Sequence, residues 1–209
     1  MTTTTPTCLP FSVTLPASPD GWQILAVFYG YTPFLYLLAC LVLFFVNRGG
    51  TREIAYMVLG GVATGICEIL KLFILGSRPG GACISASYGM PSGHSCMSLA
   101  WVTVLALDMT ISKSRASISL TTVGLTMLLL LPVPVSRIIL QDHSPSQAMA
   151  GSLIGIVLAA VWFVVSLPIR DYFSSRLGTK VLWVLTHNYP PIAPIKADDD
   201  LDAAEPLSV

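Results

Sequence analysis

Three short polar segments of the sequence contain the side chains whose types and spacing could do chemistry. Each segment contains a cation, an imidazole or both: Lys71 and Arg78 in the first, His94 with Ser92 and Gly93 in the second, and Arg137 and His143 with Gln147 in the third. Fixed cations can hold phosphate oxygens, and a glycine lets an anion approach the backbone N–H closely. An imidazole can serve as a nucleophile or as a general acid. The set is therefore typical of a phosphate pocket.

The first segment places a charge where the surrounding residues are apolar. Lys71 lies inside an apolar run, and ionisable residues in such runs are costly and usually mark function. Glu68 lies three residues earlier, within pairing reach on the same helical face, so a neutralised structural pair is the alternative interpretation. If the helix continues for two more turns, Arg78 joins Lys71 on that face before Pro79 ends the helix.

Helix starts are predicted directly beside the other two segments. Pro91 suits the first turn of a helix, and free backbone N–H groups just behind it would form an anion site at the positive helix end. In the third segment, Ser144 is predicted as the N-cap and Gln147 as the third helical residue, a Ser-x-x-Gln capping box. Asp142 adjoins His143, but successive residues diverge, so a role in orienting His143 is the less favoured interpretation.

The elements that must position these segments are long apolar runs. The chain is 54% hydrophobic and 11% charged, which excludes an ordinary soluble globular protein. Because a bilayer core needs about 20 apolar helical residues, the runs predict transmembrane helices. They cover Trp22–Val46, Ile54–Leu75, Ser95–Ile111, Ile118–Val135 and Ala148–Leu167. The predicted fold class is an all-α integral membrane protein, a bundle of about five transmembrane helices.

Positive charge is distributed unevenly between the two sides of this bundle. Eight of the eleven Lys and Arg residues fall on one side: Arg48, Arg52, Lys113, Arg115, Arg170, Arg176, Lys180 and Lys196. Since short cytoplasmic loops collect Lys and Arg, that side is predicted to be cytoplasmic and the three polar segments lumenal. The predicted divisions are a lumenal N-terminal segment 1–21, a transmembrane domain 22–167 and a cytoplasmic tail 168–209. The tail starts with an amphipathic stretch, Ile169–Leu185, and ends without structural signals.

The three segments together resemble the type 2 phosphatidic acid phosphatase superfamily, which includes lipid phosphatases and vanadium haloperoxidases. The matching residues are Lys71, six residues and Arg78-Pro79; then Pro91-Ser92-Gly93-His94; then Ser136-Arg137, five residues and His143. The resemblance implies a phosphate clamp made of Lys71, Arg78 and Arg137, with Ser92 and the Gly93 N–H as further donors. It also implies that His143 is the nucleophile. His94 is implied as the acid that protonates the leaving oxygen and later activates the water that cleaves a phosphohistidine.

Gln147 stands where that superfamily usually has an Asp, four residues after the nucleophilic His. A Gln can accept the same hydrogen bond from the imidazole but contributes no charge. In one interpretation the chain is similar to the dolichyl diphosphatases (dolichyl pyrophosphate phosphatases), which share this Gln and a Tyr-Gly-Met-Pro-Ser-x-His segment, matched by Tyr88 to His94. In the other, Gln147 only caps a helix, and the protein is a degenerate member that binds, transports or scaffolds lipid phosphates.

The resemblance favours a metal-independent enzyme that hydrolyses dolichyl diphosphate to dolichyl phosphate and phosphate, recycling a glycan carrier lipid. It implies the endoplasmic reticulum membrane, with the active site facing the lumen. Phosphatidate, other isoprenoid diphosphates and sphingoid phosphates are the alternative substrates. No cofactor and no metal site are expected, and a net charge of zero gives no electrostatic footprint for nucleic acid. The expected partners are the lipid substrate and the bilayer, and the oligomeric state is not determined by the sequence.

Cysteines, small residues and one further acid give smaller signals. The five cysteines form no CxxC pair, so neither a zinc site nor a disulfide-stapled fold is indicated. Three cysteines lie on the predicted lumenal side: Cys8, Cys83 and Cys96. The sequence alone cannot pair them. Gly151 and Gly155 have the Gly-x-x-x-Gly spacing and predict close helix packing within the molecule. Asp108, near the cytoplasmic end of its run, is expected to reach the headgroups.

Overall fold

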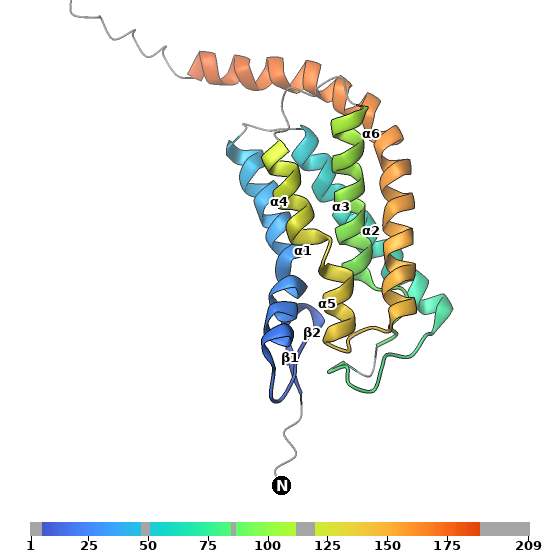
Figure 1. The fold of residues 1–209 in the computed structure, drawn as a ribbon. Coiled ribbons are helices and arrows are strands. Elements are labelled where there is room, and N and C mark those ends of the chain that lie inside the picture. Colours follow the sequence, from blue (N-terminus) through green and yellow to red (C-terminus); the bar gives the residue numbers. More distant parts are fainter. Residues whose placement is uncertain (1–5, 47–50, 85–86, 112–119, 189–209) are drawn as a thin grey trace, which may run out of the picture.

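A short β-hairpin and six α-helices make up the described part of the chain, residues 6–46, 51–84, 87–111 and 120–188 of this computed structural model (Figure 1). The hairpin consists of β1 (Thr7–Leu9), a 3₁₀ turn (Pro10–Ser12) and β2 (Val13–Leu15). The helices are α1 (Gly21–Val46), α2 (Thr51–Ile74), α3 (Gly93–Thr110), α4 (Leu120–Leu130), α5 (Val133–Ile139) and α6 (Pro145–Asn188). The predicted all-α membrane fold is confirmed.

Within the described residues, four segments are long and apolar enough to cross a bilayer, where five had been predicted. They are Gly21–Val46, Thr51–Ile74, Leu120–Ile139 and Pro145–Arg170. The predicted run Ser95–Ile111 forms α3, which is not among them. Because α3 stands in the middle of the bundle and contacts each of the other five helices, its side chains meet protein more than lipid. A helix in that position can be more polar than one that faces the bilayer.

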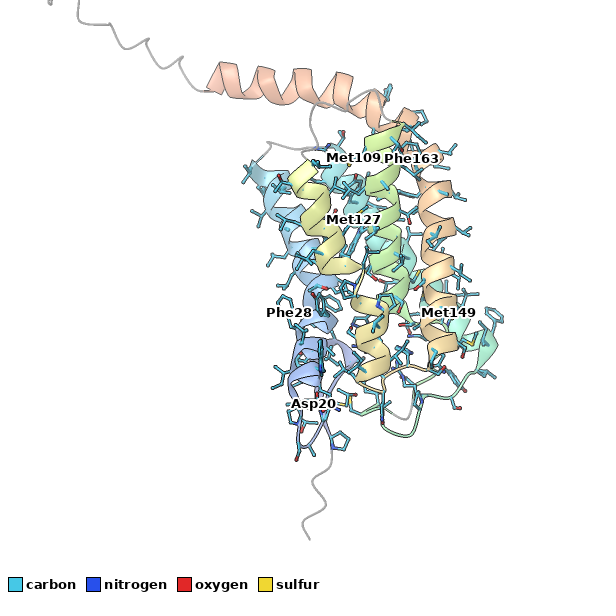
Figure 2. The ribbon with its side chains drawn as sticks, in the orientation of Figure 1. Asp20, Phe28, Met109, Met127, Met149 and Phe163 are labelled. Carbon is cyan, nitrogen blue, oxygen red and sulfur yellow. A yellow bond between two sulfur atoms is a disulfide. The ribbon has the colours of Figure 1, made fainter. Side chains whose placement is uncertain are left out.

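Outward-facing side chains of the other helices are apolar. Figure 2 shows Phe28 of α1 and Met149 of α6 on the outside of the bundle, and they are 47% and 64% exposed. A soluble protein rarely exposes such large apolar patches. The surface therefore suits a lipid environment, while the core is built around Trp101, whose Nε1 donates a hydrogen bond to the Tyr56 carbonyl (2.8 Å).

Helix α6 packs directly on the backbone of α3. A Cβ added at Gly151 would lie 2.3 Å from the Ser92 carbonyl oxygen, and one at Gly155 would lie 2.2 Å from that of Cys96. Only glycine permits this approach. The predicted close packing within the molecule is confirmed, and it fixes the start of α3, with His94, against α6.

Two predicted helices are interrupted. Helix α2 ends at Ile74 instead of continuing to Arg78, because Leu75 adopts a left-handed conformation (φ 51°) that terminates the helix. Arg78 therefore reaches the site from a loop. The fourth predicted run is divided into α4 and α5 around Pro132, since a proline cannot continue the helical hydrogen bonds of the preceding turn.

The N-terminal segment folds back onto the bundle. Strands β1 and β2 pair antiparallel, and a disulfide joins Cys8 of β1 to Cys83 in the loop that precedes α3 (Cα–Cα 5.2 Å). The expectation that no disulfide staples the fold is thus wrong for this pair, because sequence spacing does not reveal which distant cysteines meet. Cys96 is buried and free.

The predicted amphipathic stretch Ile169–Leu185 belongs to α6. That helix contains Pro168, and Figure 1 shows its C-terminal part turning across the end of the bundle. The acidic end of the tail, residues 189–209, lies outside the described residues, as do Arg48, Lys113 and Arg115.

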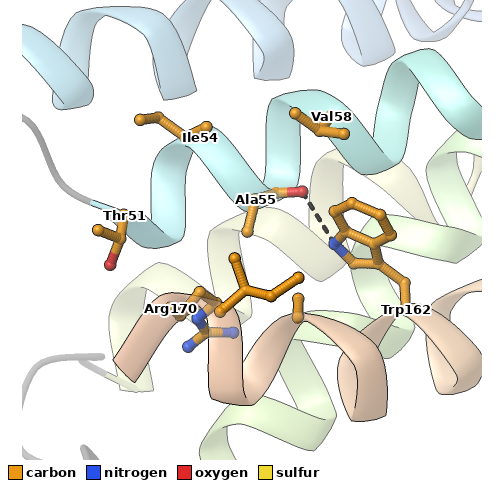
Figure 3. A pocket seen from close by; sticks show the side chains of 8 residues that line it. Thr51, Ile54, Ala55, Val58, Trp162 and Arg170 are labelled. Atoms are coloured by element: carbon orange, nitrogen blue, oxygen red, sulfur yellow. Dashed lines mark hydrogen bonds between the residues drawn. The ribbon is translucent and has the colours of Figure 1, made fainter. Parts of the chain in front are cut away.

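A groove of about 290 Å³ opens between α2 and α6 at the end of the bundle away from the hairpin (Figure 3). Its lining is almost wholly apolar and includes Ile54, Val58 and Trp162, with Arg170 at one end. The Trp162 Nε1 donates a hydrogen bond to the Ala55 carbonyl (3.0 Å), which ties α6 to α2 beside the groove.

Candidate active site

A cavity of about 110 Å³ at the hairpin end of the bundle brings the three polar segments together. Its lining residues are Ser12, Phe34, Thr64, Glu68, Lys71, Arg78, Gly93, His94, Met97, Arg137 and His143. Six of the eight predicted site residues are among them, and the other two, Ser92 and Gln147, do not line the cavity. Segments separated by dozens of residues therefore contribute to one site.

Lys71 enters the cavity from the last turn of α2. Its Nζ lies 2.5 Å from Glu68 Oε1, and the Lys71 side chain is 11% exposed while that of Glu68 is 61% exposed. The predicted Glu68–Lys71 pair is present, and the lysine nonetheless lines the cavity. Pairing with Glu68 and contact with an anion are therefore compatible.

Two hydrogen bonds hold Arg78 beside His143. Its Nε donates to Ser87 Oγ (3.0 Å) and its Nη1 to the Asp142 carbonyl (3.1 Å), and Nη1 lies 3.4 Å from His143 Nε2. Burial lowers the pKa of Arg78, and the carboxylates of Asp142 and Glu68 oppose that shift. The geometry places a guanidinium next to the nitrogen expected to attack.

Arg137 is fully buried, and only one of the three nitrogens of its guanidinium is partnered among the described residues. Its Nη2 donates to the Ser12 carbonyl (2.6 Å) and lies 3.0 Å from Asp142 Oδ2. Its Nε and Nη1 have no hydrogen-bond partner among the described residues. Leaving charged donors buried and unpaired costs free energy, so this fork is suited to receive an anion in the cavity.

His143 is arranged so that its Nε2 carries the lone pair. Its Nδ1 lies 3.3 Å from Gln147 Oε1, which can only accept, so we assign the proton to Nδ1. Burial, followed by the positive charges of Arg78 and Arg137, lowers the pKa of His143 to about 3. At neutral pH the imidazole is therefore uncharged and its Nε2 is available as a nucleophile.

Gln147 combines the two roles that the sequence left as alternatives. The Ser144 N–H donates to Gln147 Oε1 (3.1 Å), and the Gln147 N–H donates to Ser144 Oγ (3.4 Å), which confirms the capping box. The same Oε1 faces His143, and Nε2 donates to the Ser77 carbonyl (2.7 Å). Capping and contact with His143 use one side chain.

The second segment begins its helix later than predicted. Helix α3 starts at Gly93 with Ser92 as N-cap, so Pro91 precedes the helix and is not in its first turn. Ser92 is buried, and its Oγ accepts a hydrogen bond from Ser95 Oγ (3.1 Å), so it anchors the helix start without lining the cavity. A Cβ added at Gly93 would find only Cys67 Cβ, 4.0 Å away, so packing leaves open space beside this residue.

His94 faces the cavity from the first turn of α3. Its Nε2 is buried and has no partner among the described residues. Its ring packs edge to face against Phe34 of α1, with centroids 5.4 Å apart. A buried polar nitrogen in this state can exchange a proton with a bound ligand.

Sequence reasoning missed several residues of this region. Asp142 pairs with Arg137. The cavity is also lined by residues that belong to no motif: Ser12, Phe34, Thr64 and Met97. Burial raises the pKa of Asp142, while Arg137 and hydrogen bonds from Thr14 oppose this. The adjacency of Asp142 to His143 was visible in the sequence, but its partners were not.

Comparison with known proteins identifies the family of this chain. The model of the PAP2 superfamily matches residues 52–170, more than half of the chain, and no curated protein and no solved structure matches. All eight predicted site residues lie in the matched range, whereas the hairpin and α1 precede it. This confirms the resemblance at the level of the superfamily. The chain belongs to the PAP2 superfamily.

Proposed function

We propose that this protein hydrolyses dolichyl diphosphate to dolichyl phosphate and phosphate through a phosphohistidine, and so recycles a glycan carrier lipid. Membership of the PAP2 superfamily implies lipid phosphatase activity broadly, and this chain has four segments suited to crossing a membrane. The observation that supports the proposal most strongly is the buried guanidinium of Arg137, two of whose nitrogens are unpartnered among the described residues. Arg137 lines a cavity that Lys71 and Arg78 also line.

Binding of the terminal phosphate is assigned to Lys71, Arg78, Arg137 and the Gly93 N–H. Charge on a transferring phosphoryl group is spread over its oxygens, so fixed cations and N–H dipoles supply most of the stabilisation. Because these groups are already held by Glu68, Asp142 and the start of α3, little reorganisation is needed when the charge develops.

In the first step, the lone pair on His143 Nε2 attacks the terminal phosphorus. The bond between that phosphorus and the bridging oxygen breaks, and His94 gives a proton to the departing dolichyl phosphate. Gln147 Oε1 accepts the Nδ1–H of His143, which fixes the tautomer and stabilises the imidazole as its Nε2 becomes bonded to phosphorus.

In the second step, His94 takes a proton from water, whose oxygen bonds to the phosphorus. The Nε2–phosphorus bond breaks, phosphate is released, and His143 regains its lone pair. In the second step His94 regains the proton that it gives up in the first, so protons balance over the two steps.

The proposal places the cavity at the lumenal face of the endoplasmic reticulum membrane. The Cys8–Cys83 disulfide lies at the same end as the cavity, and disulfides persist in oxidising compartments. The concentration of Lys and Arg in the segments of the other side supports this orientation. In this arrangement residues 1–21 are lumenal, 22–167 form the transmembrane phosphatase domain and 168–209 are cytoplasmic.

A substrate panel tests the proposal. Purified full-length protein in lipid nanodiscs should release phosphate from dolichyl diphosphate with a higher kcat/KM than from dolichyl phosphate or phosphatidate. Higher kcat/KM for phosphatidate would retain the phosphatase and replace the substrate. Binding of all three lipids without phosphate release would instead support the degenerate, non-enzymatic interpretation.

A further inference from the structure

We propose that the N-terminal hairpin, residues 7–15, is a positioning element of the active site that holds Arg137 in phosphate-binding geometry through Thr14 and Asp142. The inference rests on the proposed phosphatase function. The hairpin precedes the range that matches the PAP2 superfamily, so the family match does not account for it.

A buried chain of contacts leads from the hairpin to the guanidinium. The Thr14 Oγ1 donates to Asp142 Oδ1, and the Thr14 N–H reaches Asp142 Oδ2 (3.4 Å). Asp142 Oδ2 lies 3.0 Å from Arg137 Nη2. All three side chains are at most 1% exposed. In this low-dielectric setting, each hydrogen bond strongly constrains the next group.

The hairpin also determines which nitrogens of Arg137 remain for a ligand. The Ser12 carbonyl and the Asp142 carboxylate both engage Nη2, whereas Nε and Nη1 have no partner among the described residues. The guanidinium is a rigid planar fork, so holding one nitrogen orients the other two. An arginine fixed in advance loses little conformational entropy when it binds a phosphate.

The hairpin is itself fixed to the bundle on two sides. The Cys8–Cys83 disulfide ties β1 to the loop before α3, and the Cys83 N–H donates to Thr14 Oγ1 (3.0 Å). On the other side Val13 packs against α1, where a Cβ added at Gly30 would lie 3.1 Å from Val13 Cγ2. The Thr14 hydroxyl therefore accepts from the loop and donates to Asp142, joining the disulfide to the arginine.

The experiment compares Thr14→Val, which removes the hydroxyl, with Thr14→Ser, which keeps it. We measure orthovanadate affinity, as a phosphate analogue, and kcat and KM for the lipid substrate in the full-length protein. Thr14→Val should lose about tenfold in vanadate affinity and in kcat/KM, and Thr14→Ser should stay within about twofold of wild type.

The matched control is Thr32→Val. Thr32 is a buried threonine of α1 whose hydroxyl donates to the carbonyls of Tyr29 and Leu129 and does not line the cavity. It should change neither vanadate affinity nor kcat/KM. Equal losses in Thr14→Val and Thr32→Val would show a general effect of losing a buried hydroxyl and would overturn the inference.

A double-mutant cycle of Thr14 and Arg137 distinguishes positioning of the guanidinium from a general structural role of Thr14. If Thr14 acts through the guanidinium, Thr14→Val should cause no further loss of vanadate affinity in an Arg137→Ala background. Additive losses would contradict the inference. Should Thr14→Val fail to fold, the double variant Cys8→Ser/Cys83→Ser replaces it in the same cycle, with the same two outcomes.

The outcomes separate the inference from the proposed function. Wild-type protein that binds vanadate but releases no phosphate contradicts the phosphatase, and the vanadate cycle still decides the role of the hairpin. Active wild-type protein whose kcat/KM and vanadate affinity are unchanged by Thr14→Val contradicts the hairpin's role alone. Wild-type protein that does not bind vanadate contradicts both.

Discussion

The two ends of the bundle both bury charged side chains, but they satisfy them differently. Away from the hairpin, buried Asp108 accepts hydrogen bonds from the Tyr56 hydroxyl (2.5 Å) and from Arg170 Nη1 (3.0 Å). At the hairpin end, buried Arg137 keeps two unpartnered nitrogens among the described residues, and His94 keeps one. The expectation that Asp108 reaches the headgroups is wrong, since Arg170 and Tyr56 enclose it.

This difference separates a structural cluster from a candidate site. Buried polar groups in proteins are almost always hydrogen-bonded, so a cluster of unpaired donors in one cavity indicates a ligand. Volume alone would select the other end of the bundle as the site. The groove beside Arg170 measures about 290 Å³, whereas the cavity beside Arg137 measures about 110 Å³. The groove has an almost wholly apolar lining and lacks convergent polar groups to orient a substrate.

The largest expected effect is that of removing the nucleophile at the hairpin end. His143→Ala should lower turnover by about 10³-fold or more, because no phosphohistidine can form, while orthovanadate binding largely survives. Phosphate release and vanadate affinity of the purified variant measure the two effects. Near-normal release would reject His143 as the nucleophile.

Asp108→Asn at the other end is the control for that comparison. Breaking the buried pair with Arg170 should cost about 3 kcal/mol of unfolding free energy. Turnover per folded molecule should remain unchanged. A large loss of turnover in folded Asp108→Asn protein would mean that the two ends are not functionally distinct.

Replacement of His94 should depend on the leaving group. In single-turnover experiments His94→Asn should slow phosphohistidine formation about 10³-fold with phosphatidate, and about tenfold with dolichyl diphosphate, because a phosphate leaves more readily than an alkoxide. The phosphoenzyme should then accumulate from the diphosphate, since water is no longer activated. Equal slowing of the first step with both lipids would contradict the acid role.

Removal of the Gln147 side chain should produce a smaller loss. Gln147→Ala should lower kcat about tenfold to a hundredfold with little change in KM, because the imidazole loses its fixed tautomer and angle. Ser144→Ala is the matched control, because Ser144 shares the capping box but contacts His143 through no side-chain hydrogen bond that the structure describes. It should cost about 1 kcal/mol of stability and leave kcat unchanged. Equal kcat losses in both variants would assign the effect to capping.

The smallest expected effect concerns pH. Protonated His143 cannot attack, and because its pKa is lowered to about 3, the fraction lost to protonation between pH 5 and 7 should be negligible. Arg78→Gln removes one of the charges that lower this pKa, so the acid limb of the kcat/KM profile should move to higher pH. Profiles of kcat/KM against pH, corrected for substrate ionisation, test this. An acid limb at the same pH in wild type and Arg78→Gln would show that the charge of Arg78 does not lower the pKa of His143.

The sequence by itself identified six of the residues that line the candidate site. Lys71, His94 and His143 could be identified because their types, order and spacing follow a family pattern. The Glu68–Lys71 pair and the Ser144–Gln147 capping box could be predicted because both depend on residues three positions apart, where helical geometry is local. The apolar runs likewise predicted most of the helices, since a bilayer imposes a minimum length.

Only the tertiary structure decided how that site is held. Thr14 and Ser12 meet Asp142 and Arg137 across 128 and 125 residues, and no local period reports such contacts. The pairing of Cys8 with Cys83 could not be predicted for the same reason, because the two residues are 75 positions apart. The place of helix α3 in the middle of the bundle could not be read from the sequence, because it is set by the helices that pack around α3. Contacts of this kind arise when distant segments share one buried volume, which depends on the whole chain and not on any segment.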